Sequence, residues 1–569
     1  MAFSERDRGK LASTEYEVLI VGGGISGAWL ALHCAQSGYK TALIDRGDYA
    51  AETSSSSSKL LHGGIRYLQQ FQFDKVRESA MERAHYLYAA PHLSSPVPFV
   101  IPTYRDIQRS KWFLNCGMLA YRVLCAGQNK IIGSKEQELP PVRSISAAEL
   151  NQLCDLGDEP HTGAVVFYER HMLNSERMVL SILQTAAEHG ADIINYVEAK
   201  RFLTENDSVV GVQAHDVLDQ NEFEIKAKLV INAAGPWIDK LNQGLKSTGH
   251  GPSISGFAIG SHIISRQISD HAIALTTKHQ SDAKIDRGGR HVFIIPWRGH
   301  SLIGTSYDEI DNPNGDLSIQ SSHVEQLLEA INEALPSARL TSEDLVSGYS
   351  GLYPLHTENI QSTVYQGSGE YQIIDHQRSD GISGVVTALG AKFTTGRKLS
   401  ALTMRVVSEH LGKPAQLKKS RLQNAQFESL RAFTEAKLLQ YQHLLPEKTI
   451  QHLVSHYGSD IDDLLTSIGD DEAMLQQITP SQPDILGQVS WAIEREQAMN
   501  LEDVLFRRTS LGFFEINETE LGQVASLMAK KLSWSDELRE QQLSNALARL
   551  QKTRATLDAA QSKVDSADG

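Results

Sequence analysis

Cysteine is scarce in this chain. Its 569 residues include four cysteines, Cys34, Cys116, Cys125 and Cys154, which form no C-x-x-C pair and lie at no spacing typical of metal ligands. So few cysteines in a chain of this length exclude a disulfide framework, and we therefore expect a reducing compartment. The same pattern predicts no metal site.

Long apolar runs and export signals are missing as well. Residues 1–15 mix acidic and basic side chains and lack the apolar core of a secretory signal. The most apolar long stretch, 112–126, is interrupted by Asn115 and Arg122 and is too short to cross a bilayer. We interpret it as a buried or cleft-lining helix, with a helix on a membrane surface as the alternative. The expected location is the cytoplasm. The alternative is a peripheral position on the inner face of the cytoplasmic membrane.

Basic charge is in deficit. The net charge is -15 and the pI is about 5.8, which argues against a general nucleic-acid partner, although a local basic cleft for an anionic substrate is compatible with it. The length exceeds what one hydrophobic core supports and predicts about two to four domains.

A glycine-rich turn near the N-terminus is the most informative pattern that is present. Gly22, Gly24 and Gly27 follow an apolar run at 16–21, and Asp45 ends a second apolar run about 20 residues later. Gly22 permits the sharp turn from strand to helix, Gly24 lets a pyrophosphate approach the backbone, and Gly27 permits close packing of helix on strand. Helix amides would then meet the phosphates, and Asp45 would accept hydrogen bonds from ribose hydroxyls. The pattern predicts a dinucleotide site.

The run TSSSSSKLLHGGIRYL at 53–68 allows two interpretations. Its composition is typical of a flexible linker. Its position at the start of a helix candidate, 60–90, suits an ordered turn that contacts a phosphate or a flavin.

Later segments indicate a mixed sheet followed by helices. A strand at 228–231 ends in NAAGPW at 232–237, and a strand at 385–388 meets GAKFTTGRK at 390–398. Further strands are expected at 260–265, 291–296 and 301–305, and helical periodicity dominates beyond 415. We interpret the leucine seam within 536–564 as packing against the body, with a partner coiled coil as the alternative.

Together these segments resemble the FAD-dependent glycerol-3-phosphate dehydrogenase family, within the amino-acid-oxidase-like flavoprotein superfamily. The resemblance covers about residues 14–515 and is most specific in HGG-x-R-Y at 62–67; it includes GSH at 260–262 and EDVLFRR at 502–508. It implies an α/β fold with a Rossmann-like FAD-binding domain, an antiparallel-sheet substrate domain and an α-helical C-terminal domain. The implied segments are 14–100, 165–255 and 345–410 for FAD binding, 101–164 and 256–344 for the substrate, and 411–569 for the helical domain.

The resemblance also implies a cofactor site and partners. We expect noncovalent FAD, a small-molecule substrate, and a quinone or oxygen as electron acceptor; no pattern specifies an oligomeric state. The implied FAD contacts are Gly22, Gly24, Ile25, Ser26, Gly27, Asp45, Arg46, Thr53, Ser54, Ser58, Lys59, Leu60, His62, Gly63, Gly64, Ala233, Gly235, Trp237, Gly390, Lys392, Phe393 and Thr394.

Oxidation of a carbon that bears an alcohol or amine needs a base for the proton and positive potential near the flavin. His262 is the candidate base, because histidine titrates near working pH. Lys392, close to a helix start, is the candidate cation. By resemblance, Arg66 and Tyr67 are expected near flavin and substrate.

One segment departs from the family pattern. The family typically reads Y-S-G-x-R-P-L, whereas this chain reads YSGLYPL at 349–355, so that Tyr353 replaces an arginine expected to bind phosphate. A second family arginine has no clear counterpart at 357–371. A hydroxyl does not replace the charge and planar fork of a guanidinium.

We therefore predict a dehydrogenase or oxidase for a small alcohol or amine other than glycerol 3-phosphate, with Tyr353 in the substrate site. The alternative is glycerol-3-phosphate dehydrogenase itself, forming dihydroxyacetone phosphate, with the phosphate held by Arg66, Arg298 or Arg397. A more distant alternative is a noncatalytic flavin-binding assembly protein.

Overall fold

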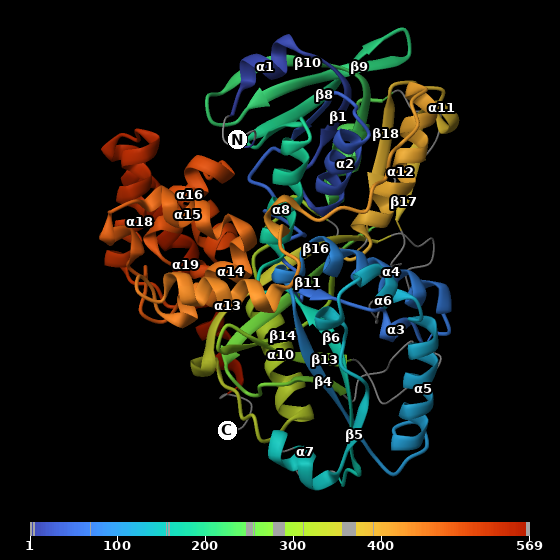
Figure 1. Cartoon of the computed structure of the whole chain (residues 1–569), viewed down its shortest axis with the longest axis vertical. Coiled ribbons are helices and arrows are strands. Elements are labelled where there is room, and N and C mark those ends of the chain that lie inside the picture. The colour runs from blue at the N-terminus through green and yellow to red at the C-terminus, as the bar shows by residue number, and fades with distance from the viewer. Residues whose placement is uncertain are drawn as a thin grey trace.

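The computed structural model describes residues 3, 6–68, 70–154, 156, 160–245, 254, 256–276, 291–310, 312–355, 371–390 and 392–564. Its described strands form an eight-stranded and a ten-stranded sheet. Figure 1 shows the first sheet at the top of the molecule, the second sheet below it, and the C-terminal helices beside both. The predicted α/β fold with a helical C-terminal region is confirmed.

The first sheet is parallel at its centre. β1 (Glu15–Val21) runs parallel to β2 (Thr41–Ile44) and β10 (Asn221–Asn232), and β10 runs parallel to β18 (Val385–Leu389). Because these strands run in one direction, their C-terminal ends meet at one edge of the sheet, where a ligand binds in folds of this kind. The other strands are β7 (Asp192–Ile194), β8 (Val197–Glu205), β9 (Ser208–Asp216) and β17 (Gln372–Asp375).

Helices cover this sheet because its central strands are apolar on both faces. Every residue of β2 is buried, as expected for a strand of a parallel sheet. α2 (Ile25–Gln36) packs against α8 (Ser175–Glu188) and α12 (Gly396–Leu411), and ten of its residues are buried. This packing fixes the N-terminus of α2 at the C-terminal edge of β1.

The second sheet is mainly antiparallel. β11 (Gly256–Arg266) pairs with β14 (His300–Gly304), β15 (Asp308–Ile310) and β16 (Leu345–Leu355). The remaining strands are β3 (Leu60–Leu61), β4 (Ser95–Thr103), β5 (Arg143–Ile145), β6 (Gly163–His171), β12 (Ala272–Thr276) and β13 (His291–Trp297).

Four strands of the second sheet fall wholly or mostly within segments that the sequence assigned to the FAD-binding domain. These are β3 and β16, which lie there in full, and β4, which lies there in large part; β6 also falls mostly within the segment 165–255. The chain passes between the sheets several times, and an apolar pattern does not tell which sheet a strand joins. The domain boundaries therefore stay a proposal.

The C-terminal region is helical, and its last helix packs on the body. α19 (Asp536–Val564) contacts α10 (Ser321–Ala334) and β16, Leu557 is buried, and the Arg554 guanidinium donates to the Leu345 carbonyl at 2.7 Å. The leucine seam is thus interior packing. The preceding helices are α13 (Leu430–Tyr441), α14 (Glu447–Tyr457), α15 (Ile461–Ile468), α16 (Leu486–Glu496), α17 (Leu501–Asp503) and α18 (Glu518–Leu532).

The helix expected at 60–90 was wrong in its extent. β3 comes first, a short α3 (Ile65–Leu68) follows, and the long helix is α4 (Phe73–Ala89). Gly64, with a left-handed φ of +79°, separates β3 from α3, and Phe71, with a φ of +58°, lies in the turn between α3 and α4.

α5 (Lys111–Leu124), the helix predicted as buried or cleft-lining, is buried on one face only. Leu114 and Met118 are buried, whereas Trp112 is 73%, Leu119 63% and Val123 64% exposed. No helix among the described residues has the combination of length and apolar character that a membrane crossing needs.

Candidate active site

A cavity of about 410 Å³ lies where the C-terminal edge of the first sheet meets β11 and β16 of the second. Of the residues predicted as sites, those in its lining are Gly22, Gly24, Ile25, Ser26, Asp45, Arg46, Thr53, Ser54, Ser58, Ala233, Gly235, Trp237, His262, Tyr353, Gly390, Lys392 and Phe393. These residues come from segments that are far apart in sequence, and the junction of the two sheets brings them together.

The glycine turn needs its glycines for different reasons. Gly22 has a φ of +111°, and a Cβ there would lie 2.5 Å from the Ala233 carbonyl oxygen. A Cβ on Gly27 would lie 1.8 Å from the Gly22 carbonyl oxygen, so Gly27 permits close packing and does not line the cavity. Gly24, the N-cap residue of α2, has no side chain that could cap the helix, and the first amide, that of Ile25, donates to the Ser54 hydroxyl; the amides that follow are available to an anion.

Asp45 closes the turn at the end of β2. Its carboxylate accepts hydrogen bonds from the Gly23 amide at 2.6 Å and from the Gly47 amide at 2.8 Å. Burial raises the pKa of Asp45 to about 6, against the opposite effect of these two amides. Each carboxylate oxygen has a further lone pair, with which it can accept a hydrogen bond from a ribose hydroxyl.

The serine-rich run is an ordered turn. The Ser54 hydroxyl accepts a hydrogen bond from the Ile25 amide at 3.0 Å, and the Thr53 hydroxyl donates to the Leu352 carbonyl at 2.5 Å. A Cβ on Gly351 would lie 2.6 Å from Ser56 Cβ. The run therefore ties the N-terminus of α2 to β16 and does not act as a linker.

His262 lies on β11 and is 4% exposed. Its Nε2 atom is 3.0 Å from Ser58 Oγ, and its ring stacks on Tyr349 with centroids 5.1 Å apart. Burial and then the positive charge of Lys59 lower the pKa of His262 to about 3. The imidazole is therefore neutral at working pH, but, contrary to the expectation from the sequence, it does not titrate there, and it is a weaker base than an ordinary histidine.

Lys392 and Tyr353 approach the cavity from different sheets. Lys392 follows β18 and precedes α12, and its Nζ lies 3.9 Å from the centroid of the Tyr67 ring. Tyr353 lies on β16 opposite Ala258 of β11, and its ring centroid is 6.1 Å from that of Tyr307. The cavity thus combines a neutral base, a cation and an aromatic side chain.

Several residues predicted as cofactor contacts do not line the cavity. The Lys59 ammonium is buried against Glu176, at 3.1 and 3.2 Å from its carboxylate oxygens, and the Gly63 amide donates to Glu169 at 2.9 Å. In the described part of the chain, the residues outside the lining are Gly27, Lys59, Leu60, His62, Gly63, Gly64 and Thr394. The Arg66 side chain, predicted as catalytic, lies outside the described residues.

The sequence also missed residues that line the cavity. These are, among others, Asp48, Ser56, Ser57, Glu198, Lys200, Lys240, Gly260 and Thr305. Ser56 and Ser57 belong to the serine run and were within reach of the prediction. Glu198 and Lys200 lie on β8, a strand whose polar residues carried no recognisable motif. In the described residues no group of three or more His, Cys, Asp or Glu side chains could hold a metal ion.

Comparison with known proteins identifies this architecture. A family model described as FAD dependent oxidoreductase matches residues 17–399, and one described as the C-terminal domain of alpha-glycerophosphate oxidase matches 422–539. The chain is 30% identical over 550 residues to a glycerol-3-phosphate dehydrogenase of Synechocystis sp., which covers 94% of this chain and 96% of that protein. The chain belongs to the FAD-dependent glycerol-3-phosphate dehydrogenase family. It is an enzyme, and its cofactor is FAD.

Other members of the glycerol-3-phosphate dehydrogenase family agree with this assignment. An aerobic glycerol-3-phosphate dehydrogenase of Staphylococcus aureus is 29% identical over 549 residues, with 93% of each chain covered. The solved structure of glycerol-3-phosphate dehydrogenase from Bacillus halodurans complexed with FAD superimposes with a TM-score of 0.74 at 25% identity and covers 97% of this chain and 98% of that one.

The described residues fit FAD as the family uses it. Backbone amides at the start of α2 are available to an anion, and a Cβ on Gly24 would already lie 3.0 Å from Ser54 Oγ, so a larger side chain would fill the cradle. Gly24, Ile25 and Ser26 would hold the pyrophosphate, and Asp45 the adenosine ribose. Bound FAD supplies the hydride acceptor.

Proposed function

We propose that this enzyme oxidises a small alcohol or amine other than glycerol 3-phosphate by removing two electrons as a hydride. The observation that carries the proposal is Tyr353 in the lining of the cavity that also contains His262. Tyr353 stands where the family resemblance expects an arginine that binds phosphate. Tyrosine offers an aromatic face and one hydroxyl but no positive charge.

Three basic residues of the lining support this proposal, whereas the fourth among the described residues, Lys392, lies over the Tyr67 ring. Arg46 pairs with Glu52 at 3.4 Å, and Lys200 and Lys240 pair with Glu198 at 2.9 and 3.2 Å. A substrate phosphate would have to compete with these carboxylates for the same cations.

The two arginines considered for phosphate and described with their side chains are also engaged. Arg298 pairs with Asp484 at 3.0 Å, and Arg397 pairs with Glu82 at 2.7 Å. Neither belongs to the lining found among the described residues. These pairings weaken the case for a phosphate at the substrate end.

In the proposed reaction His262 accepts the proton of the substrate hydroxyl or amine. Its neutral imidazole is held by the contact with Ser58 and by the stacked ring of Tyr349. Lys392 supplies positive potential to the reacting end of the cavity and stabilises negative charge that develops there. Tyr353 presents its ring or hydroxyl to one end of the substrate. In glycerol 3-phosphate, the alternative substrate, that end would carry the phosphate.

The alternative, oxidation of glycerol 3-phosphate to dihydroxyacetone phosphate, is favoured by the relatives. The proteins from Synechocystis and Staphylococcus aureus bear the name glycerol-3-phosphate dehydrogenase and match this chain over more than nine-tenths of its length. Because position 353 is a tyrosine, the alternative requires that cationic side chains at other positions bind the phosphate.

The electron acceptor is proposed to be a quinone reached at a membrane surface, with oxygen as the alternative. The support is the outer face of α5, where Trp112, Leu119 and Val123 are exposed beside the basic residues Lys111 and Arg122. Apolar side chains flanked by basic ones suit an anionic lipid surface.

An anaerobic substrate screen tests the proposed function. The protein loaded with FAD is mixed with alcohols, hydroxy acids, amines and glycerol 3-phosphate, and bleaching of the flavin absorbance is recorded by stopped flow. Fast bleaching by an alcohol or amine, with slow bleaching by glycerol 3-phosphate, supports the proposal. Fast, saturable bleaching by glycerol 3-phosphate replaces it with the alternative.

A further inference from the structure

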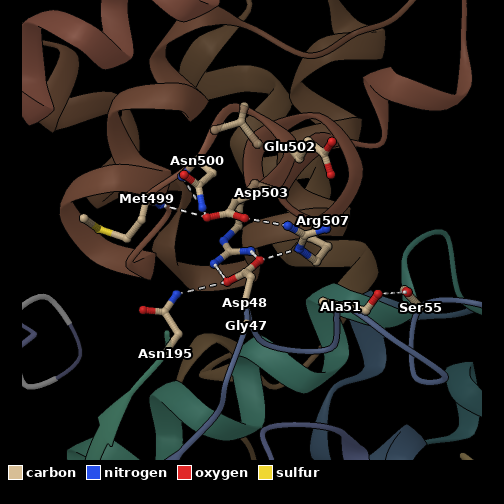
Figure 2. Close-up of polar contacts among 12 residues, drawn as sticks. Gly47, Asp48, Ala51, Ser55, Asn195, Met499, Asn500, Glu502, Asp503 and Arg507 are labelled. Carbon is tan, nitrogen blue, oxygen red and sulfur yellow. Dashed lines mark hydrogen bonds and ion pairs between the residues drawn. The ribbon is translucent and has the colours of Figure 1, made fainter. Parts of the chain in front are cut away.

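The loop that follows β2 is held by the C-terminal region. Residues 45–51 lead away from the end of β2, and Asp45 and Asp48 both line the cavity. Asp48 is 2% exposed and accepts hydrogen bonds from Arg507 Nε at 2.5 Å and from Arg508 Nη1 and Nη2 at 2.7 and 2.8 Å. Figure 2 shows Asp48 and Arg507 turned toward one another.

The two arginines are themselves fixed by their own region. Arg507 Nη2 donates to Asp503 at 2.5 Å, a contact also drawn in Figure 2, and Arg508 Nη2 donates to the Glu496 carbonyl at 2.8 Å. Both arginines lie in η8 (Val504–Thr509), a π-helical turn. Such a turn is wider than an α-helical one and is common at functional sites, and here it lets two consecutive side chains reach one carboxylate.

The other face of the loop contacts the glycine turn. The Ala50 amide donates to the Gly23 carbonyl at 3.2 Å, and a Cβ on Gly23 would lie 2.7 Å from the Tyr49 ring. The Tyr49 hydroxyl donates to Gln497 Oε1 at 2.9 Å. The loop is therefore clamped between the glycine turn and the C-terminal region.

The buried ion pairs between this loop and η8 are not explained by stability alone. Asp48, Arg507 and Arg508 are all buried, and a buried ion pair is seldom worth more to stability than apolar packing of the same volume. Asp48 also receives a hydrogen bond from Asn195 Nδ2 at 3.2 Å, so its orientation is fixed from both regions. Fixed geometry, more than stability, is what such a network supplies.

We propose that Arg507 and Arg508 are positioning residues for FAD. By fixing Asp48 they hold loop 45–51, and with it the Asp45 carboxylate, in the geometry that binds the adenosine end of the cofactor. The helical C-terminal region thereby contributes to FAD affinity although none of its described residues lines the cavity. By reciprocity, FAD binding stabilises the contact between loop 45–51 and η8.

The test measures FAD affinity in two variants and one control. Arg507→Lys keeps the charge and removes the fork, and Asp48→Asn tests the same contact from the FAD-binding side. The control is Lys437→Met, which removes the pair of Lys437 with Asp462 at 2.6 Å in the same C-terminal region but away from η8 and loop 45–51. The Kd of FAD is measured by fluorescence titration of each apoprotein, after circular dichroism has verified its fold.

We expect both test variants to raise the Kd of FAD by about tenfold, which is the effect of about one lost hydrogen bond. The control should stay within about twofold of the wild type. Hydrogen exchange of the Gly47 and Ala50 amides should accelerate in the test variants and not in the control. Added FAD should raise the thermal midpoint of Arg507→Lys less than that of the wild type.

Two results would overturn the proposal. One is a wild-type Kd in a folded Arg507→Lys or Asp48→Asn protein. The other is an equal rise in Kd in Lys437→Met, which would mean that FAD affinity follows the general stability of the C-terminal region. If Arg507→Lys does not fold, Asp48→Asn decides between the outcomes by the same titration and exchange measurement.

Discussion

The Nε2 atom of His262 lies 3.0 Å from the hydroxyl oxygen of Ser58. This contact joins the candidate base on β11 to the serine-rich turn that follows the first sheet. The Tyr349 hydroxyl donates to the neighbouring Ser57 carbonyl at 2.6 Å, and the Tyr349 ring stacks on His262. A run with the composition of a linker thus fixes the orientation of the base.

Replacing His262 should separate chemistry from cofactor binding. We expect His262→Ala to keep FAD and to slow flavin reduction by substrate about 10²- to 10⁴-fold, the scale of a lost acid–base group. Stopped-flow absorbance measures the rate. His300→Ala is the control, because His300 lies on β14 outside the lining. If His262→Ala reduces its flavin at the wild-type rate, a residue other than His262 is the base.

The pH dependence should reflect the buried environment of His262. Burial and Lys59 lower its pKa to about 3, so the imidazole stays neutral as the pH falls from 7 to 5. An ordinary histidine with a pKa of about 6.5 would lose about 25-fold of its neutral form over that range. We expect no such acid limb in the second-order rate constant of flavin reduction by an alcohol. A limb near pH 6.5 that disappears in His262→Gln would contradict the prediction.

Lys392 should influence both rate and redox potential. Lys392→Met removes a cation that stabilises negative charge at the reacting end of the cavity. We expect slower flavin reduction and a lower reduction potential, measured by anaerobic dye equilibration. Lys398→Met is the matched control, since it removes the same charge from α12 outside the lining. An unchanged potential in Lys392→Met would show that Lys392 is not near the reacting end.

Tyr353 should determine the substrate. We expect Tyr353→Ala to impair oxidation of the substrate found in the screen, while Tyr353→Arg gains binding of glycerol 3-phosphate. Two charge-assisted contacts, at about 1.5 to 3 kcal/mol each, correspond to about 10²- to 10⁴-fold in affinity. The ratio of kcat/KM for the two substrates is the measurement, and Tyr307→Phe, a neighbour outside the lining, is the control. Efficient oxidation of glycerol 3-phosphate by the wild type would refute this prediction.

Gly24 should be required for FAD retention for a steric reason, because any larger side chain would occupy the space of the cofactor. Its φ of -79° and ψ of -174° suit any residue, so Gly24→Val strains no backbone but places a side chain in the cradle. We expect a folded, colourless protein that stays without FAD after incubation with excess cofactor, as read from its visible spectrum. Gly522→Ala, where a Cβ meets open space, should remain yellow. Retention of FAD by Gly24→Val would move the pyrophosphate away from this turn.

Local sequence patterns predicted much of the part of the site that binds the adenosine end of the cofactor. The turn at Gly22, the helix after it and the acid at Asp45 are set by neighbours in sequence, because the strand period, the helix period and the glycine conformations are local properties. The family resemblance located His262 and Tyr353, and both line the cavity. The roles of these residues stay predictions.

Other features were beyond any local pattern. The sequence placed Lys59 at the cofactor, whereas its ammonium is buried against Glu176 of α8. Likewise, the sequence described 112–126 as a buried or cleft-lining helix, yet Trp112 and Leu119 face outward. In each case the answer depends on which distant element packs against the segment.

The sequence by itself determined the glycine turn and a dinucleotide site, because their signals come from residues that are close in the chain, and its resemblance to a known family supplied the fold class and FAD. Only the tertiary structure decided that the serine run orients His262 and that Arg507 and Arg508 fix Asp48. These contacts join residues separated by hundreds of positions, and their geometry arises only when the two sheets and the C-terminal helices pack together. The same packing buries charged side chains beside their ion-pair partners and, by burying His262, lowers the pKa of that residue.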